Sequence, residues 1–250
     1  EALKRRVAEL ATQPLDPSRP LWQFHLVEDL DGARSALICR IHHCIGDGIA
    51  LIAVTLSIAD GGTPPPQQLQ RSRKTPHGEH DSLFETLLQP VSALAARGVL
   101  DAPADAARIG LQAAQDAAAL AFMPDDSPTR LKGQATPGKR VAWCEPLPLD
   151  DVKAVAQAFG VSINDVLTAA VAGALGAYLR DKGDDTLDCE IRAMVPVNLR
   201  PLDQAWQLGN RFGLVPLLLP IGIAHPAERL YAVHARMQAL KGSFQPLLAF

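Results

Sequence analysis

The fold is organised around the stretch Ile41-His42-His43-Cys44-Ile45-Gly46-Asp47-Gly48, which joins two adjacent histidines to an aspartate between two glycines. Residues 35–43 alternate as the two faces of a strand do, whereas residues 48–59 carry apolar side chains at helical spacing. Since successive strand residues face opposite sides, His42 and His43 are expected to leave the strand end in opposite directions. Only one of them can then point at a given target.

The composition is that of a globular chain, with 250 residues, of which 48% are hydrophobic and 20% charged. This length suffices for one large domain or two small ones. The net charge of −3 and the absence of a basic tract argue against nucleic acid as a partner. An aromatic content of 5% also argues against a platform for stacking bases.

Cysteine usage and hydropathy indicate a cytoplasmic protein. We expect buried, reduced thiols, because no Cys-x-x-Cys pair occurs among Cys39, Cys44, Cys144 and Cys189. No signal peptide is visible, and the longest uncharged runs are shorter than the ~20 residues of a membrane-spanning helix. A soluble or peripheral protein is therefore expected. Because the chain starts at Glu1 inside an expected helix, we also expect it to be a piece of a longer one.

Periodicity predicts helices and strands without a strict strand–helix–strand rhythm. Helices are expected at residues 2–12, 48–59, 83–122 with breaks near 98 and 103, 152–159, 166–180 and 226–241. Strands are expected at residues 22–27, 35–43, 141–144, 191–197 and 215–223, the first two as a hairpin. Asp150 is expected to cap the helix at 152–159 and Gly160 to end it. Residues 63–81 are interpreted as a linker and 124–139 as a loop. This pattern favours an α+β fold, with helices packed on a mixed or antiparallel sheet.

His43 is the strongest candidate for chemistry. A neutral imidazole titrates close to physiological pH and can accept a proton from a hydroxyl group. The turn Gly46-Asp47-Gly48 leaves space beside the ring and permits unusual backbone angles. Asp47 directly precedes the helix at 48–59 and can cap it, or it can pair with Arg200 or Arg211. A structural role of Asp47 is favoured over direct proton transfer.

Two other chemistries are disfavoured. Adjacent strand histidines diverge, so His42 and His43 cannot easily share a metal ion with Asp47, and no third histidine has suitable spacing. No Gly-x-Ser-x-Gly sequence is present that could place a serine nucleophile. We therefore expect neither a metal site nor a serine nucleophile.

Three stretches resemble a known enzyme family. Residues 42–48 resemble the HHxxxDG motif of the CoA-dependent acyltransferase superfamily, which includes chloramphenicol acetyltransferase, plant BAHD acyltransferases and peptide-synthetase condensation domains. Pro20-Leu21-Trp22 and Asn164-Asp165 resemble the PLW and ND motifs of the bacterial wax ester synthase/acyl-CoA:diacylglycerol acyltransferases. Residues 196–200 and Leu208-Gly209-Asn210 are also similar to that family, although Asn198 stands where the family usually has serine.

The resemblance implies a chloramphenicol-acetyltransferase-like fold of two lobes, with the active site in a tunnel between them. Residues 1–62 would then be the C-terminal part of the first lobe and carry HHxxxDG. Residues 63–138 would be a linker with connecting helices. Residues 139–250 would be the N-terminal part of the second lobe and carry the ND motif.

The resemblance also implies roles for single residues. His43 would be the general base for a hydroxyl group that attacks the thioester of acyl-CoA, and Asn164 would donate to the oxyanion. Asp165 is more simply explained as part of a capping box with Ser162. Leu21 and Trp22 would line the substrate channel, with strand core as an equal alternative. His42, Gly46, Gly48 and Arg200 would support the motif.

The expected substrates are acyl-CoA and either diacylglycerol or a long-chain alcohol, with no cofactor. The expected location is cytoplasmic, with peripheral contact to a membrane or lipid inclusion as an open alternative. Two other functions stay open. One is a condensation-type enzyme acting on carrier-bound thioesters, and the other is a non-catalytic paralogue that binds lipid.

Overall fold

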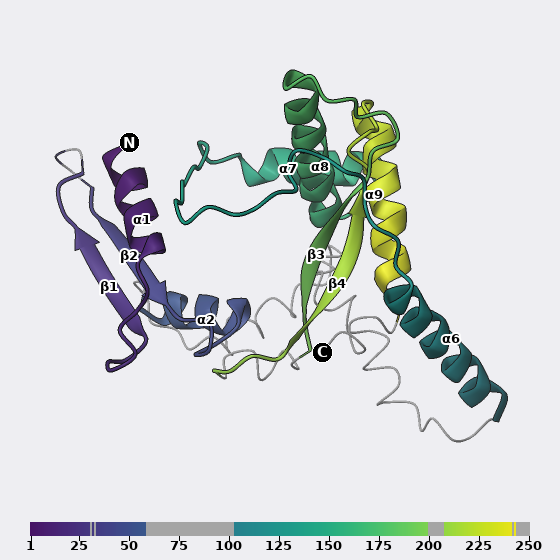
Figure 1. Cartoon of the computed structure of the whole chain (residues 1–250), viewed down its shortest axis with the longest axis horizontal. Helices are drawn as coiled ribbons and strands as arrows, with labels where there is room; N and C mark the ends of the chain where they lie inside the picture. Colours follow the sequence, from purple (N-terminus) through teal and green to yellow (C-terminus); the bar gives the residue numbers. More distant parts are fainter. Residues whose placement is uncertain (31, 33, 59–102, 200–207, 242, 244–250) are drawn as a thin grey trace. The chain divides into compact units, whose positions relative to one another are not determined.

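The structure is a computed structural model that describes residues 1–30, 32, 34–58, 103–199, 208–241 and 243. Its helices are α1 (Ala2–Thr12), α2 (Gly48–Ile58), α6 (Pro103–Ala121), α7 (Leu149–Phe159), α8 (Ile163–Asp181) and α9 (Pro226–Lys241) (Figure 1). Its strands are β1 (Trp22–Val27), β2 (Ala36–Ile41), β3 (Ile191–Asn198) and β4 (Phe212–Leu219). The mixture of helices and antiparallel strand pairs agrees with the predicted α+β class. The expected linker at 63–81 and the expected helix at 83–102 lie outside the described residues.

The chain divides into two compact units. The first contains Glu1–Thr75, Gly133–Pro146 and Pro201–Arg211, and the second contains Pro76–Lys132, Leu147–Arg200 and Phe212–Phe250. The turn at residues 42–48 therefore belongs to the first unit, and the Asn164-Asp165 pair belongs to the second. Each unit is described by itself below.

The β1–β2 hairpin is the predicted sheet of the first unit. The two strands pair antiparallel, with Trp22 opposite Ile41 and Val27 opposite Ala36. Side chains alternate between an exposed and a half-buried face, as the period of a strand requires. The exposed face carries large apolar residues, including Trp22 at 50% and Leu26 at 62% exposure. The alternative that Trp22 lies in a strand core is therefore wrong; its ring instead lies 5.2 Å from that of Phe24.

Two strand predictions for the first unit are wrong. The strand expected to reach His43 ends at Ile41, because the chain then folds into a turn in which the Ile45 N–H donates to the His42 carbonyl at 3.0 Å. Residues 141–144 form no strand. They are held instead by a side chain of α1, since Lys4 Nζ donates to the Trp143 carbonyl at 3.3 Å and lies 5.0 Å from the centre of the Trp143 ring.

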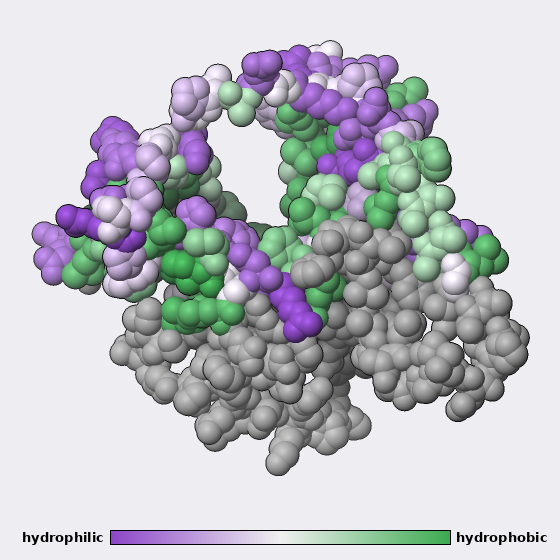
Figure 2. All heavy atoms as spheres, turned by 60° about the horizontal axis from the view of Figure 1, so that its bottom comes forward, coloured by the Kyte–Doolittle hydropathy of each residue, from purple (hydrophilic) through white to green (hydrophobic). Residues whose placement is uncertain are grey.

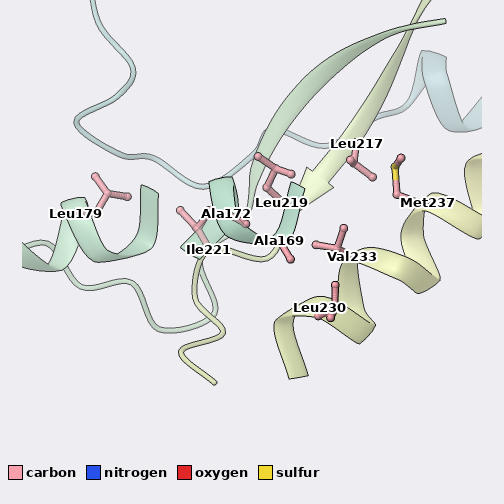
Figure 3. Packing of buried hydrophobic residues seen from close by; sticks show 9 residues of the cluster. All are labelled: Ala169, Ala172, Leu179, Leu217, Leu219, Ile221, Leu230, Val233 and Met237. Atoms are coloured by element: carbon pink, nitrogen blue, oxygen red, sulfur yellow. The ribbon is translucent and has the colours of Figure 1, made fainter. Parts of the chain in front are cut away.

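The core of the second unit lies between α8, α9 and the β3–β4 pair (Figure 3). The strands pair antiparallel, with Ile191 opposite Leu219 and Asn198 opposite Phe212. The apolar strand predicted at 215–223 begins earlier and stops at Leu219, because Pro220 follows and cannot donate to a ladder. The buried cluster is contributed by α8, β4, the turn after it, and α9, and comprises Ala169, Ala172, Leu179, Leu217, Leu219, Ile221, Leu230, Val233 and Met237.

The helix caps of the second unit agree with the prediction, except at the start of α7. α7 begins at Leu149 after Pro148, so Asp150 lies inside the first turn rather than at the capping position, and its predicted role as cap is wrong. The helix starts this early because the fixed φ of proline suits the residue before a helix, here −60°. Gly160 ends α7 with a left-handed φ of 64°, as predicted.

The expectation of buried thiols is wrong for three of the four cysteines. All four cysteines are free, but three of them are exposed, namely Cys39, Cys44 and Cys144, while Cys189 is half-buried. Cys39 lies on the exposed face of the hairpin and Cys44 in the turn after it. Apolar and polar residues are mixed over the surface drawn in Figure 2.

No single helix among the described residues has the length and hydropathy to cross a membrane. The pair α7 and α8 meets the criterion together but is bent by 99° at its break.

Candidate active site

The turn after β2 gives its two histidines different surroundings. The His42 N–H donates to the Leu21 carbonyl at 2.9 Å and so continues the hairpin ladder by one bond. The His42 ring turns back on the chain, and its Nδ1 accepts the Cys44 N–H at 3.2 Å. His43 is the next residue, and it is exposed. Both histidines are exposed, and the His42 ring stabilises the turn through its Nδ1, while the His43 imidazole lies at the surface of the first unit.

Residues 208–211 form hydrogen bonds with the main chain of this turn. Gly46 and Gly209 form a parallel bridge, in which the Asp47 N–H donates to the Gly209 carbonyl at 3.1 Å and the Gly209 N–H donates to the Ile45 carbonyl at 2.9 Å. Asn210 Nδ2 donates to the His43 carbonyl at 2.8 Å. The main chain that carries His43 is thus held by a segment from the far end of the first unit.

Asp47 joins the two segments with both oxygens of its carboxylate. Its Oδ1 accepts the Ala50 N–H at 3.1 Å and caps α2, as predicted. Its Oδ2 accepts the main-chain N–H of Arg211 at 3.2 Å. The residue is only 5% exposed. A buried carboxylate engaged in this way orders the loop, which supports the structural role; Arg200, the other expected partner, lies outside the described residues.

Of the two glycines in the turn, Gly46 lies where a side chain would be crowded, and neither glycine has an unusual φ. Gly46 and Gly48 both have ordinary φ values, so the expectation of special backbone angles is wrong for them. A Cβ on Gly46 would meet the Ala50 side chain at 3.3 Å, whereas one on Gly48 would meet nothing within 4 Å. The left-handed glycine is Gly209, with a φ of 120°, on the segment opposite.

Asn164 and Asp165 lie in the first turn of α8, in the second unit. The predicted capping box is present: the Asp165 N–H donates to Ser162 Oγ at 3.2 Å, and the Ser162 N–H donates to Asp165 Oδ2 at 3.0 Å. Asp165 is fully buried, and His234 Nδ1 on α9 lies 2.8 Å from the same Oδ2. Asn164, one position earlier, is half-buried. Asn164 therefore directly precedes a residue that is held by Ser162 and His234.

The structure groups the predicted residues within each of the two units. His42, His43, Gly46 and Asp47 meet in one turn, with Leu21 bonded to it, while Asn164 and Asp165 meet in the other unit. Among the described residues, no group of His, Cys, Asp and Glu is arranged to hold a metal ion. The chemistry that this turn offers is proton transfer by an exposed imidazole.

Two family models match the chain. The family model for the wax ester synthase/diacylglycerol acyltransferase catalytic domain matches residues 1–167, and the model for the C-terminal domain of the same family matches residues 208–250. The chain belongs to the wax ester synthase/diacylglycerol acyltransferase family. The stretch of residues 42–48 falls within the catalytic-domain match, and the segment that fastens it, residues 208–211, falls at the start of the C-terminal match.

Curated members of the family cover nearly all of the chain. A Mycobacterium tuberculosis protein, provisionally assigned as a diacylglycerol O-acyltransferase, is 34% identical over 244 residues, which are 96% of this chain and 52% of that protein. The protein tgs2 of the same bacterium, with a similar assignment, is 31% identical over 94% of this chain and 51% of its own length. The chain thus spans about half the length of the curated relatives it matches.

Solved structures show the fold. The wax ester synthase/diacylglycerol acyltransferase from Marinobacter aquaeolei VT8 matches with a TM-score of 0.54 at 22% identity, over 96% of this chain and 48% of that one. The first condensation domain of the CDA synthetase matches with a TM-score of 0.50 at 19% identity, over 97% and 51% of the two chains. The predicted chloramphenicol-acetyltransferase-like fold, which these two proteins share, is therefore confirmed.

Sequence reasoning gave no role to two residues of the site. Asn210 holds the His43 carbonyl, and His234 pairs with Asp165. The family-like stretch Leu208-Gly209-Asn210 was a signal for the first, although it did not reveal the partner. No sequence pattern pointed to His234, because a histidine on a helix face has no characteristic spacing to a cap 69 residues away.

Proposed function

We propose that the protein is an O-acyltransferase that moves a fatty acyl group from acyl-CoA to the hydroxyl of diacylglycerol or a long-chain alcohol. The observation that carries this proposal is the exposure of His43 on a turn whose main chain is hydrogen-bonded to Leu21 and to residues 208–211. A general base needs an accessible imidazole on a main chain that does not move away from its substrate. Membership of the wax ester synthase/diacylglycerol acyltransferase family supplies the substrate classes.

In this mechanism His43 accepts the proton of the acceptor hydroxyl as its oxygen attacks the thioester carbonyl of acyl-CoA. A C–O bond forms, and the carbonyl oxygen becomes the oxyanion of a tetrahedral intermediate. The intermediate collapses when the C–S bond breaks, and the proton on the imidazole passes to the departing CoA thiolate. Atoms and charge balance without a covalent enzyme intermediate, so neither a nucleophilic residue nor a cofactor is required.

Asn164 is the proposed donor to the oxyanion. Its side-chain amide carries two N–H groups, and it stands at the N-terminal end of α8, where the helix dipole also favours negative charge. Donors fixed in advance contribute more than donors that must reorganise, and loss of one such donor slows related reactions by about 10²–10³-fold. The capping box beside Asn164 supplies this fixed position.

The test uses the intact protein at its natural length, with palmitoyl-CoA and, in separate assays, hexadecanol, diacylglycerol and a primary amine. His43→Ala should lower the rate with the hydroxyl acceptors by about 10²–10⁴-fold while the melting temperature stays unchanged. His225→Asn, which removes an exposed histidine from the second unit, should leave the rate unchanged. A His43→Ala rate close to wild type would exclude His43 as the base. Product with the amine alone would identify the condensation-type alternative, and no product with any acceptor would favour a lipid-binding paralogue.

We also propose that the protein is cytoplasmic and contacts a membrane or lipid inclusion peripherally, because both proposed acceptors reside in lipid. One side of α6 supports this. Leu111 in α6 and Phe122, which directly follows the helix, are 61% and 84% exposed and lie about three helical turns apart, so that they share one side with small alanines between them. Replacing both by serine should reduce sedimentation with diacylglycerol-containing vesicles, whereas Leu187→Ser, at a residue 76% exposed elsewhere, should not. Equal sedimentation of all three proteins would remove α6 as the contact.

A further inference from the structure

We propose that His234 is a positioning residue for acyl transfer: it holds the first turn of α8, and with it Asn164, through the buried carboxylate of Asp165. This inference rests on the proposed role of Asn164 as oxyanion donor. His234 lies on α9 and belongs to none of the motifs that identify the family. Its ring reaches Asp165 from a different helix, at a distance of 2.8 Å between Nδ1 and Oδ2.

The contact determines which ring nitrogen carries a proton. Toward an ionised carboxylate, which can only accept hydrogen bonds, the His234 ring donates from Nδ1. Asp165 is fully buried, while the His234 side chain is 29% exposed. A charge-assisted bond at this depth is stronger than one in water, and its loss is correspondingly harder to replace.

Asp165 has few other donors. Its Oδ2 also accepts the Ser162 N–H at 3.0 Å, while its Oδ1 is buried with no hydrogen-bond partner among the described residues. Without His234, the buried carboxylate would keep one main-chain donor from its own cap and no side-chain donor. Burying a charge with so little compensation is unfavourable, so the carboxylate would rotate or draw in water. Either change moves the turn that carries Asn164.

The rest of the α8–α9 contact does not replace this bond. One turn farther along, Arg229 Nε donates to the Ala169 carbonyl at 3.0 Å, and Leu230 and Val233 pack in the cluster with Ala169 and Ala172 (Figure 3). These contacts hold the body of α8 against α9. His234 is the contact at the level of Asn164, where the helix begins. Its effect is therefore expected on the orientation of one amide rather than on the fold of the unit.

Two amide substitutions separate the hydrogen bond from the volume of the ring. In His234→Asn, the side-chain amide nitrogen takes the place of Nδ1 and can donate to Asp165. In His234→Gln, the amide reaches the place of Nε2, and no donor stands at the position of Nδ1. In the intact protein, kcat should fall by about 10-fold or more in the glutamine variant, because misplacing a catalytic group by ~1 Å can slow a reaction up to about 10²-fold. In the asparagine variant kcat should stay within about threefold of wild type, and KM for acyl-CoA should stay unchanged in both.

A double-mutant cycle with Asn164→Ala shows whether His234 acts through Asn164. If it does, His234→Gln should cause no further loss of kcat once the Asn164 amide is gone. A structural residue would instead lower kcat by the same factor in both backgrounds. His234→Ala, which also lacks the donor, is measured in the same cycle in case the glutamine variant does not fold.

Three outcomes overturn the inference: wild-type kcat in both His234→Gln and His234→Ala, equal losses in His234→Gln and His234→Asn, or losses that multiply with that of Asn164→Ala. His43→Ala, assayed alongside, distinguishes these from failure of the proposed function. If His43→Ala is inactive while the cycle shows no coupling, the acyltransferase mechanism stands and His234 is not a positioning residue. If His43→Ala is active while the cycle is fully coupled, the base assignment fails and the positioning role stands.

Discussion

Replacing Asp47 by asparagine separates the two tasks of its carboxylate. Oδ1 caps α2 through the Ala50 N–H, and Oδ2 accepts the Arg211 N–H from the segment that also holds the His43 carbonyl. Asparagine is as good a helix cap as aspartate, so the first bond can persist. The new NH₂ group would face the Arg211 N–H, and two donors cannot bond to each other. The variant therefore removes one of the hydrogen bonds between the segments, the bond made by the carboxylate, and leaves the cap.

The size of the effect follows from burial. Asp47 is 5% exposed, so water cannot easily replace the lost acceptor. A hydrogen bond to a charged group contributes about 1.5–3 kcal/mol, and we expect Asp47→Asn to lower the free energy of unfolding of the first unit by about 2 kcal/mol. At about 2–4 °C per kcal/mol, this corresponds to a fall of about 4–8 °C in melting temperature. Asp47→Ala also loses the cap and should fall further, by about 1 kcal/mol more.

The assay is thermal and urea denaturation of the intact protein followed by tryptophan fluorescence, with acyl transfer measured in parallel. Trp22 is a suitable reporter, because its strand begins beside the turn. Asp150→Asn is the matched control: this carboxylate also lies in a first helical turn, but it is 93% exposed, and its loss should change stability by less than about 0.5 kcal/mol. If Asp47→Asn lost activity but melted like the wild type, the structural role derived above would be wrong, and Asp47 would take part directly in the chemistry.

Three further predictions concern the second unit and are checked by denaturation of the intact protein. Gly176→Ala should destabilise the protein by about 1–3 kcal/mol, because its Cβ would lie 2.2 Å from the Ile221 carbonyl oxygen. Gly110→Ala in α6, where a Cβ would meet nothing within 4 Å, should instead stabilise it by up to about 1 kcal/mol. Equal melting temperatures of the two variants would contradict this prediction. Leu217→Ala should destabilise the protein by about 2–5 kcal/mol, because Leu217 lies in the core and is 2% exposed. Leu214→Ala, on the opposite face of β4 at a residue that is 39% exposed, should destabilise it clearly less. A larger loss of stability in Leu214→Ala would show that the core lies elsewhere. Hydrogen bonds from the Lys132 ammonium and the Arg192 N–H lower the pKa of Asp126 to about 2. The stabilisation that they bring is therefore complete above about pH 4 and is lost as the pH falls toward 2. Asp126→Asn should lose less stability than the wild type over that interval, and parallel stability–pH profiles of the two proteins would refute this prediction.

Most helices could be predicted because their determinants are local. α1 and α9 have the predicted bounds, and the capping box at Ser162 and the left-handed Gly160 were identified from residue types within four positions of each other. Interactions of such short range are encoded in the spacing of the residues themselves. The strands were less reliable. The strand β2 ends at Ile41, and residues 141–144 pair with no strand among the described residues, which alternation alone does not reveal.

The sequence alone pointed to the turn at residues 42–48, predicted His43 as the base, and identified the family with the help of residues 20–22 and 164–165, because each of these signals depends on residue types within one short stretch. Folding supplied the rest. The bonds from Asn210 to His43 and from Arg211 to Asp47 span 167 and 164 positions, and the bond from His234 to Asp165 spans 69. No local pattern encodes such pairs, and neither does it encode exposure, which is why the thiols expected to be buried lie at the surface. Contacts between distant segments and the burial of a side chain are decided only in the folded chain, because both depend on which other segments pack against a residue.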